Sequence, residues 1–249
     1  MRQIDETRGG ALTVAPRFNG PPGVTNGGYA CGLAAEPIGP AASVRLLAPM
    51  PVGVPLDRRT GPDGTVTVRH GDVVVADAVP GEPTVAPRPA PSLAAARHAT
   101  RRYAAADPDR HIFPTCVVCG PLRPDDGLHV FPGPLSAGDV LACPWTPAPG
   151  LGGQGGRIDS RLVWAALDCP SGFACMPEGR VSVLATMTAR IDAPVRAGET
   201  YVIAAWPLER GERKHRGASA VYAADGTPLA VAEALWITLE GDRGARWQA

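Results

Sequence analysis

A buried helix that carries a carboxylate is the feature of this sequence that most constrains its fold. Residues 162–167 are apolar on every side of a helix, so a helix here is buried all round. Asp168 follows directly, at a place where a charge is costly unless it is paired or used. Pro170 removes a backbone N–H and disfavours helical geometry at Cys169, which predicts a bend. The alternative is that Asp168 caps a helix that begins at Pro170.

The overall composition excludes several classes of partner. The 249 residues hold 24 Lys and Arg against 24 Asp and Glu, so no basic surface for nucleic acid or for a membrane is expected. The N-terminus has no apolar segment of the kind found in secretory signals, and no apolar run reaches the ~18 residues of a membrane span. We therefore expect a cytoplasmic protein in which the six cysteines are reduced.

The sequence repeats one pattern of elements. Helices are predicted at 26–36 and 160–175, each after a Gly- and Pro-rich loop and each followed by alternating, strand-like segments. Gly27, Gly28 and Gly32 each cost ~1 kcal/mol in a helix, so they predict a ligand or another chain segment against that backbone. The repeat predicts two units. The predicted strands are at 10–18, 42–47, 64–70, 73–79, 128–131, 140–145, 181–191, 200–206, 214–222 and 229–239, and the predicted units are residues 1–105 and 106–249.

Four segments of the chain resemble one family. Residues 23–29 are similar to the H-G-G segment of hotdog thioesterases, with Asn26 where His is usual. Residues 116–121 with Gly127 and Leu128 resemble the C-x-x-C-G…G-L segment of many of them. Residues 163–170 and 232–237 resemble the second helix and the closing strand of double-hotdog acyl-CoA thioesterases. The resemblance implies an α+β double hotdog, in which two antiparallel sheets each wrap around a central helix.

The same resemblance implies a site between the two helices. It implies a thioesterase-like hydrolase of an acyl-CoA or acyl-carrier-protein thioester, with Asp168 as general base or nucleophile and with Asn26 and the Gly28 amide polarising the carbonyl. Asn26 in place of His can donate a hydrogen bond but cannot titrate. No cofactor is implied, and a homo-oligomer remains an open possibility. The substrate-binding positions implied are Gly27, Gly28, Tyr29 and Trp164.

Two other functions remain open. The missing His is also compatible with a hotdog protein that binds an acyl thioester or related ligand without hydrolysing it. A hotdog hydratase or dehydratase needs an Asp–His pair, and no His lies near Asp168 in the sequence. Glu36 is the candidate acid of a second site, although it stands at a helix end beside Pro37, and Asp159 is expected to cap the second helix. One working site is therefore expected.

The cysteines raise the question of a metal. Cys116 and Cys119 have the spacing of half a zinc site, with His111, His129 or Cys143 as further candidates. Zinc sites usually contain two such pairs, so the sequence favours a turn with buried thiols and predicts no metal. Cys169 beside Asp168 is a weak candidate nucleophile, because no His stands at a useful spacing.

Overall fold

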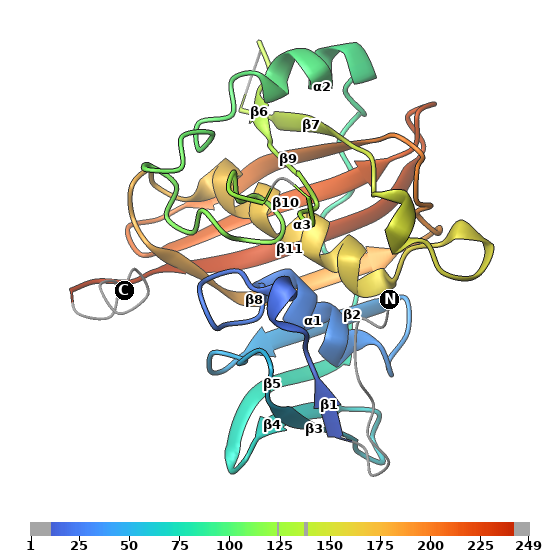
Figure 1. The fold of residues 1–249 in the computed structure, drawn as a ribbon, viewed down its shortest axis with the longest axis vertical. Coiled ribbons are helices and arrows are strands. Elements are labelled where there is room, and N and C mark those ends of the chain that lie inside the picture. The colour runs from blue at the N-terminus through green and yellow to red at the C-terminus, as the bar shows by residue number, and fades with distance from the viewer. Residues whose placement is uncertain (1–10, 124, 137–138, 242–249) are drawn as a thin grey trace.

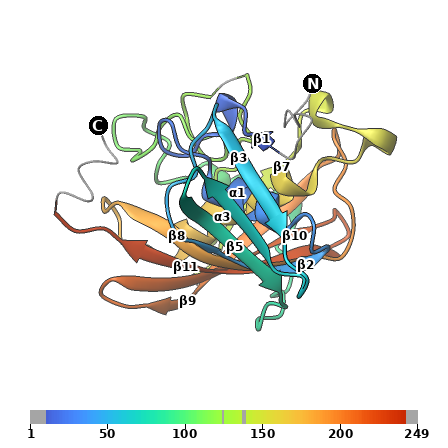
Figure 2. The same cartoon turned by 90° about the horizontal axis from the view of Figure 1, so that it is seen from below.

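One continuous antiparallel sheet forms the framework of the protein. The structure, a computed structural model, describes residues 11–123, 125–136 and 139–241. Within these ranges eleven strands are arranged in the order β1-β3-β4-β5-β2-β8-β11-β10-β9-β7-β6 (Figures 1 and 2). The strands are β1 (Ala11–Thr13), β2 (Ala41–Leu46), β3 (Pro55–Thr60), β4 (Val66–His70), β5 (Val73–Pro80), β6 (Gly133–Pro134), β7 (Leu141–Trp145), β8 (Ser182–Ile191), β9 (Tyr201–Arg210), β10 (Lys214–Tyr222) and β11 (Pro228–Thr238).

Each half of the sheet curves around one central helix. Helix α1 (Gly27–Ala35) lies against the strands of the first half, and α3 (Ser160–Cys175) lies against those of the second (Figure 1). The two sheets of the predicted double hotdog are joined edge to edge, because β2 pairs with β8 from Ala41↔Arg190 to Arg45↔Thr186. The predicted α+β class and the double hotdog are therefore confirmed, with the two sheets continuous.

Close packing of α1 on α3 explains the glycines of the first helix. A Cβ atom at Gly28 would lie 2.5 Å from the Trp164 carbonyl oxygen, and one at Gly32 would lie 2.7 Å from the Arg161 Cα. Neither position has room for any side chain, so the glycines allow the helix backbones to approach each other directly. Of the two explanations that the sequence left open, a neighbouring chain segment accounts for Gly28 and Gly32.

The second half of the sheet is covered on both faces. Successive residues of a strand point to opposite faces. On β10, Ala218 and Ala220 pack in the apolar cluster that includes Ala96 and Ala99 of α2 (Leu93–Thr100), whereas Ser219 faces α3 and bonds the Leu167 carbonyl. Helix α2 thus packs against strands of the second half, and the unit boundary after residue 105 stays a prediction.

Some predicted elements differ from those observed. The predicted helices at 26–36 and 160–175 agree with α1 and α3, and because α3 continues through Pro170, a helix beginning at Pro170 is wrong. Residues 128–131 form no strand, since they run beside the 116–120 turn, and β3 was not predicted. In the part of the chain that the structure describes, no helix has the length and apolarity to cross a membrane. The described residues also include three short 3-10 helices, at Pro16–Phe18, Pro149–Leu151 and Gln154–Gly156.

Candidate active site

The side chain of Asp168, on α3, points at the N-terminus of α1. Its Oδ2 atom accepts hydrogen bonds of 2.9 Å from Asn26 Nδ2 and of 2.9 Å from the Gly28 N–H. The first turn of a helix has N–H groups without partners in the helix and the positive end of the helix dipole, so it favours a carboxylate. The two catalytic candidates of the sequence, Asp168 and Asn26, are therefore in direct contact.

Both ends of the Asn26 amide are occupied. Asn26 is the N-cap of α1, and its Oδ1 accepts a 3.0 Å hydrogen bond from the Tyr29 N–H. Because that oxygen can only accept, the Nδ2 group is the end that faces Asp168. The cap interaction thus fixes the orientation of the amide that holds the carboxylate.

Only one oxygen of Asp168 is held. The residue is 2% exposed, and its Oδ1 atom has no hydrogen-bond partner in the described part of the chain. Burial raises the pKa of Asp168 to about 7, while the hydrogen bonds from Gly28 and Asn26 act in the opposite direction. A buried polar atom without a partner is unusual enough to require an explanation, and a reacting molecule is one.

A cavity of about 590 Å³ reaches Asp168. Its volume lies in the range of small-molecule sites, which are mostly apolar with a few polar groups. The apolar lining includes Met50, Phe173, Leu184 and Trp236, and the polar lining includes Asn26 and Asp168. Three exposed arginines also line the cavity, namely Arg102, Arg110 and Arg180.

The four predicted substrate-binding residues have different positions. Gly27 lines the cavity, and the Gly28 N–H is bonded to Asp168. Tyr29 is fully buried and stacks on Phe18 with ring centroids 4.4 Å apart, and it is not on the cavity lining. Trp164 is also absent from the lining, because its side chain packs over Gly32 between the helices. The structure therefore brings the backbone of the α1 N-terminus to the site, but not these two rings.

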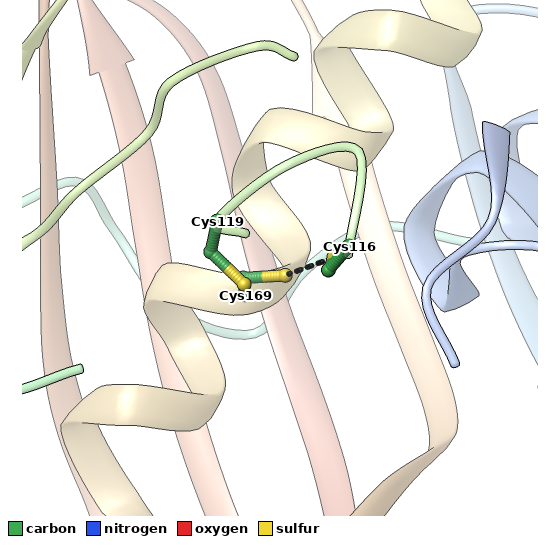
Figure 3. A group of neighbouring side chains, drawn as sticks. All are labelled: Cys116, Cys119 and Cys169. Atoms are coloured by element: carbon green, nitrogen blue, oxygen red, sulfur yellow. Dashed lines mark hydrogen bonds between the residues drawn. The ribbon is translucent and has the colours of Figure 1, made fainter. Parts of the chain in front are cut away.

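Three thiols, which spacing alone did not group, lie beside Asp168. The sulfur atoms of Cys116, Cys119 and Cys169 are all within 4.8 Å of one another, and all three residues line the cavity. Figure 3 shows that Cys116 and Cys119, on a loop that crosses α3, point toward Cys169 on the helix. Cys143 and His129, which the sequence offered as further zinc ligands, are outside this group.

A relay of hydrogen bonds anchors the cysteine loop. His111 Nδ1 accepts from the Phe113 N–H at 3.0 Å, so the neutral ring carries its proton on Nε2, which faces Tyr103 Oη at 3.1 Å. Tyr103 in turn donates to the Cys119 carbonyl at 3.1 Å. Burial lowers the pKa of His111, which agrees with the neutral ring. His111 and Tyr103 line the cavity. The sequence offered His111 only as a zinc ligand, and no pattern in it indicated Tyr103.

The second helix entry has a structural role. Asp159 is the N-cap of α3, as expected, and accepts a 2.9 Å hydrogen bond from the Arg161 N–H. Glu36, the candidate acid of a second site, stands at the other end of α1 from Asn26 and pairs with Arg58 at 2.5 Å. It is not part of the cavity lining.

Comparison with known proteins gives the fold a name. No protein-family model and no curated protein sequence matches this chain. A provisionally named thioesterase from Novosphingobium aromaticivorans matches with a TM-score of 0.63 and 16% identity, over 97% of this chain and 100% of that one. The acyl-CoA thioesterase II of Mycobacterium marinum matches with a TM-score of 0.57 and 11% identity, over 96% and 97% of the two chains. A hot dog protein of unknown function from Alicyclobacillus acidocaldarius matches with a TM-score of 0.57 and 14% identity, over 96% of both.

These matches define the class of the protein as a double-hotdog fold that extends over nearly the whole chain. The resemblance to double-hotdog thioesterases is confirmed at the level of the fold.

Proposed function

We propose that the protein hydrolyses acyl thioesters with Asp168 as its catalytic carboxylate. The observation that carries the proposal is the asymmetry of this side chain. Oδ2 is held by Asn26 and Gly28, whereas Oδ1 has no partner among the residues that the structure describes and belongs to a residue that lines the cavity. Because the bonds to Oδ2 fix the orientation of the carboxylate, the free Oδ1 atom is already positioned for a reaction.

The free oxygen supports two catalytic routes that have the same overall reaction. As a general base, Oδ1 takes a proton from water while the water oxygen adds to the thioester carbonyl carbon. The C–S bond then breaks, and the proton on Asp168 passes to the departing thiolate. As a nucleophile, Oδ1 attacks the carbonyl carbon itself, and the C–S bond breaks to release the thiolate and leave an anhydride. Water then hydrolyses the anhydride, and the proton released from the water passes to the thiolate. Both routes convert thioester and water into acid and thiol.

The donors for the carbonyl oxygen differ from those that the sequence suggested. Asn26 Nδ2 and the Gly28 N–H both point at Asp168, so we assign them the positioning of the carboxylate. The Tyr29 N–H serves Asn26 Oδ1, which leaves the N–H of Gly27, a residue on the cavity lining, as the donor assigned to the carbonyl. Loss of one such donor typically costs about 3 kcal/mol of transition-state stabilisation.

The cavity supports an acyl-CoA as the substrate. Its apolar lining suits an acyl chain, and Arg102, Arg110 and Arg180 are exposed on it, where guanidinium groups can bind phosphates. One structural relative is named an acyl-CoA thioesterase II. An acyl-carrier-protein thioester contains the same thioester group as an acyl-CoA. With that substrate, the mouth of the cavity would contact a carrier protein instead of CoA.

The proposal is tested with a panel of acyl-CoA substrates and detection of the released thiol. Asp168→Asn retains an oxygen for Gly28 and Asn26 but removes the basic oxygen, so kcat/KM should fall by about 10²–10⁴, the usual contribution of an acid–base group. Asp72→Asn, in the exposed hairpin between β4 and β5, is the control and should leave the rate unchanged. Full activity of Asp168→Asn contradicts the mechanism.

One observation favours the alternative of binding without hydrolysis. The Asn26 and Gly28 donors, which the family resemblance assigned to the carbonyl, are engaged by Asp168 itself. A panel that yields no free thiol, together with a rise in Tm on adding acyl-CoA, supports a binding protein. The hydratase alternative is not favoured, because both ring nitrogens of His111 already have partners.

A further inference from the structure

The three thiols beside Asp168 have the separations of metal ligands. Cys116 Sγ lies 3.9 Å from Cys169 Sγ, and all three sulfur atoms lie within 4.8 Å of one another (Figure 3). A tetrahedral zinc ion with Zn–S bonds of about 2.3 Å places its sulfur ligands about 3.8 Å apart. The thiols can therefore reach one ion with small changes of their side-chain torsions.

The loop that carries two of these cysteines is held firmly. The Gly120 N–H closes the turn by donating to the Cys116 carbonyl at 2.9 Å. A Cβ atom at Gly120 would lie 2.5 Å from the Pro114 carbonyl oxygen, so only glycine fits this turn. The Leu128 N–H donates to the Val117 carbonyl at 2.7 Å and thereby fastens the outer side of the loop. With the His111–Tyr103 relay, these bonds fix the backbone that presents Cys116 and Cys119.

A side-chain hydrogen-bond donor stands beside two of the three sulfur atoms. Asn26 Nδ2 lies 3.9 Å from Cys116 Sγ and 3.8 Å from Cys169 Sγ, which is within the range of hydrogen bonds to sulfur. Donors of this kind orient metal ligands and stabilise their negative charge. A disulfide can join only two of the three sulfur atoms, whereas a single metal ion can bind all three.

An ion bound by these three thiols would be open to the cavity. All three cysteines line it, so water or a ligand can reach an ion between them. His111 cannot supply the fourth ligand, because its Nδ1 lone pair already accepts from the Phe113 N–H and its Nε2 carries the proton. Zinc held by three cysteines with water in the fourth position is known in zinc deaminases, where a carboxylate that is not a ligand stands beside it.

We propose that Cys116, Cys119 and Cys169 bind one Zn²⁺ ion as thiolates, with the fourth coordination position open to the cavity that Asp168 lines. The sequence offered only one Cys-x-x-Cys pair and so predicted no metal. The third ligand comes from α3, separated from Cys116 by 53 positions, and no local spacing reveals it. The proposal concerns binding alone, and it holds whether or not the protein hydrolyses thioesters.

The experiment measures metal on the whole protein under reducing conditions. Protein prepared without chelator should contain about one zinc per chain, as a single site requires. After removal of the metal with a chelator, Co²⁺ added to the wild-type chain should produce the sulfur-to-cobalt charge-transfer band and the visible bands of a tetrahedral site, and Zn²⁺ should abolish them. This titration needs no variant and therefore does not depend on how a variant folds.

Variants then identify the ligands. Cys116→Ser, Cys119→Ser and Cys169→Ser should each weaken zinc binding by at least about tenfold, the lower end of what changes to groups around a metal ligand cost. Cys143→Ser, a buried cysteine outside the cluster, should bind zinc like the wild type. Wild-type protein with reduced thiols that gives no cobalt band, or that lacks two titratable thiols because a disulfide has formed, overturns the proposal. An inactive protein with one zinc per chain supports this proposal and contradicts only the proposed function.

Discussion

Gly28 serves Asp168 in two ways at once. Its N–H donates to the carboxylate, and its missing side chain lets α3 come close enough for that bond to form. A Cβ atom at Gly28 would lie 2.5 Å from both Asp168 Cβ and the Trp164 carbonyl oxygen, and 2.9 Å from Ala165 Cα. Two of these three atoms belong to helix backbone, which cannot turn aside as a side chain can.

Gly28→Ala should therefore lower the free energy of unfolding by about 1–3 kcal/mol, the usual cost of overpacking, even after the ~1 kcal/mol gain in helix propensity. It should also lower thioesterase activity, because the helices separate at the catalytic carboxylate. Denaturant unfolding and the acyl-CoA assay measure the two effects. For the stability measurement alone, Gly27→Ala is the matched control, since its Cβ would meet the side chain of Leu184 at 3.0 Å and no helix backbone. Equal destabilisation by the two variants contradicts this explanation.

The sequence indicated some residues of the site and concealed others for physical reasons. Asp168 stood out because a charge in an apolar helix is costly, and Asn26 because it begins a glycine-rich helix. Their contact depends on how α1 packs on α3, which neither segment encodes alone. The grouping of Cys169 with Cys116 and Cys119 depends on a loop crossing α3, so local spacing could not predict it.

At the scale of elements, α3 was predicted because residues 162–167 are apolar on every side and follow a Gly- and Pro-rich loop. Strand β3 was missed because it begins at Pro55 and carries Arg58 and Arg59, which conceal the alternation expected of a strand. Residues 128–131 have the composition of a strand, yet they pair with the cysteine loop instead of the sheet. Helix α3 is joined to β11 by a polar contact, since Ser171 Oγ accepts from Trp236 Nε1 at 3.1 Å and donates to the Asp168 carbonyl at 2.7 Å.

Ser171→Ala should lower the free energy of unfolding by about 1–3 kcal/mol, because it leaves the buried Trp236 N–H without a partner. Combining it with Trp236→Phe, which removes that donor, should cost less than the sum of the two single changes. Denaturant unfolding of the wild type, both single variants and the double variant completes the cycle. Strictly additive effects would show that this contact does not couple α3 to β11.

At the scale of the whole molecule, the two halves share their sheet and their helix contact. Strands β2 and β8 pair over five residues, and Thr188 Oγ1 donates to Ser43 Oγ at 2.9 Å across this junction. Each central helix packs against the other, so separation of the halves would expose the apolar surface of both. One apolar cluster includes residues of both halves, from Leu12 to Trp236.

Unfolding should therefore be a single cooperative transition despite the internal repeat. Tryptophan fluorescence reports on the second half and, through Trp164, on its contact with α1, because all five tryptophans follow residue 140. Hydrogen exchange at the amides of β4 and β5 reports on the first half. If the halves unfold together, the slowest of these amides should exchange through global unfolding. The free energy of opening obtained from their exchange should then equal the free energy of unfolding obtained from fluorescence. Amides of the first half that open at a clearly lower free energy would show that it unfolds by itself, and that the shared sheet and helix contact do not couple the two units.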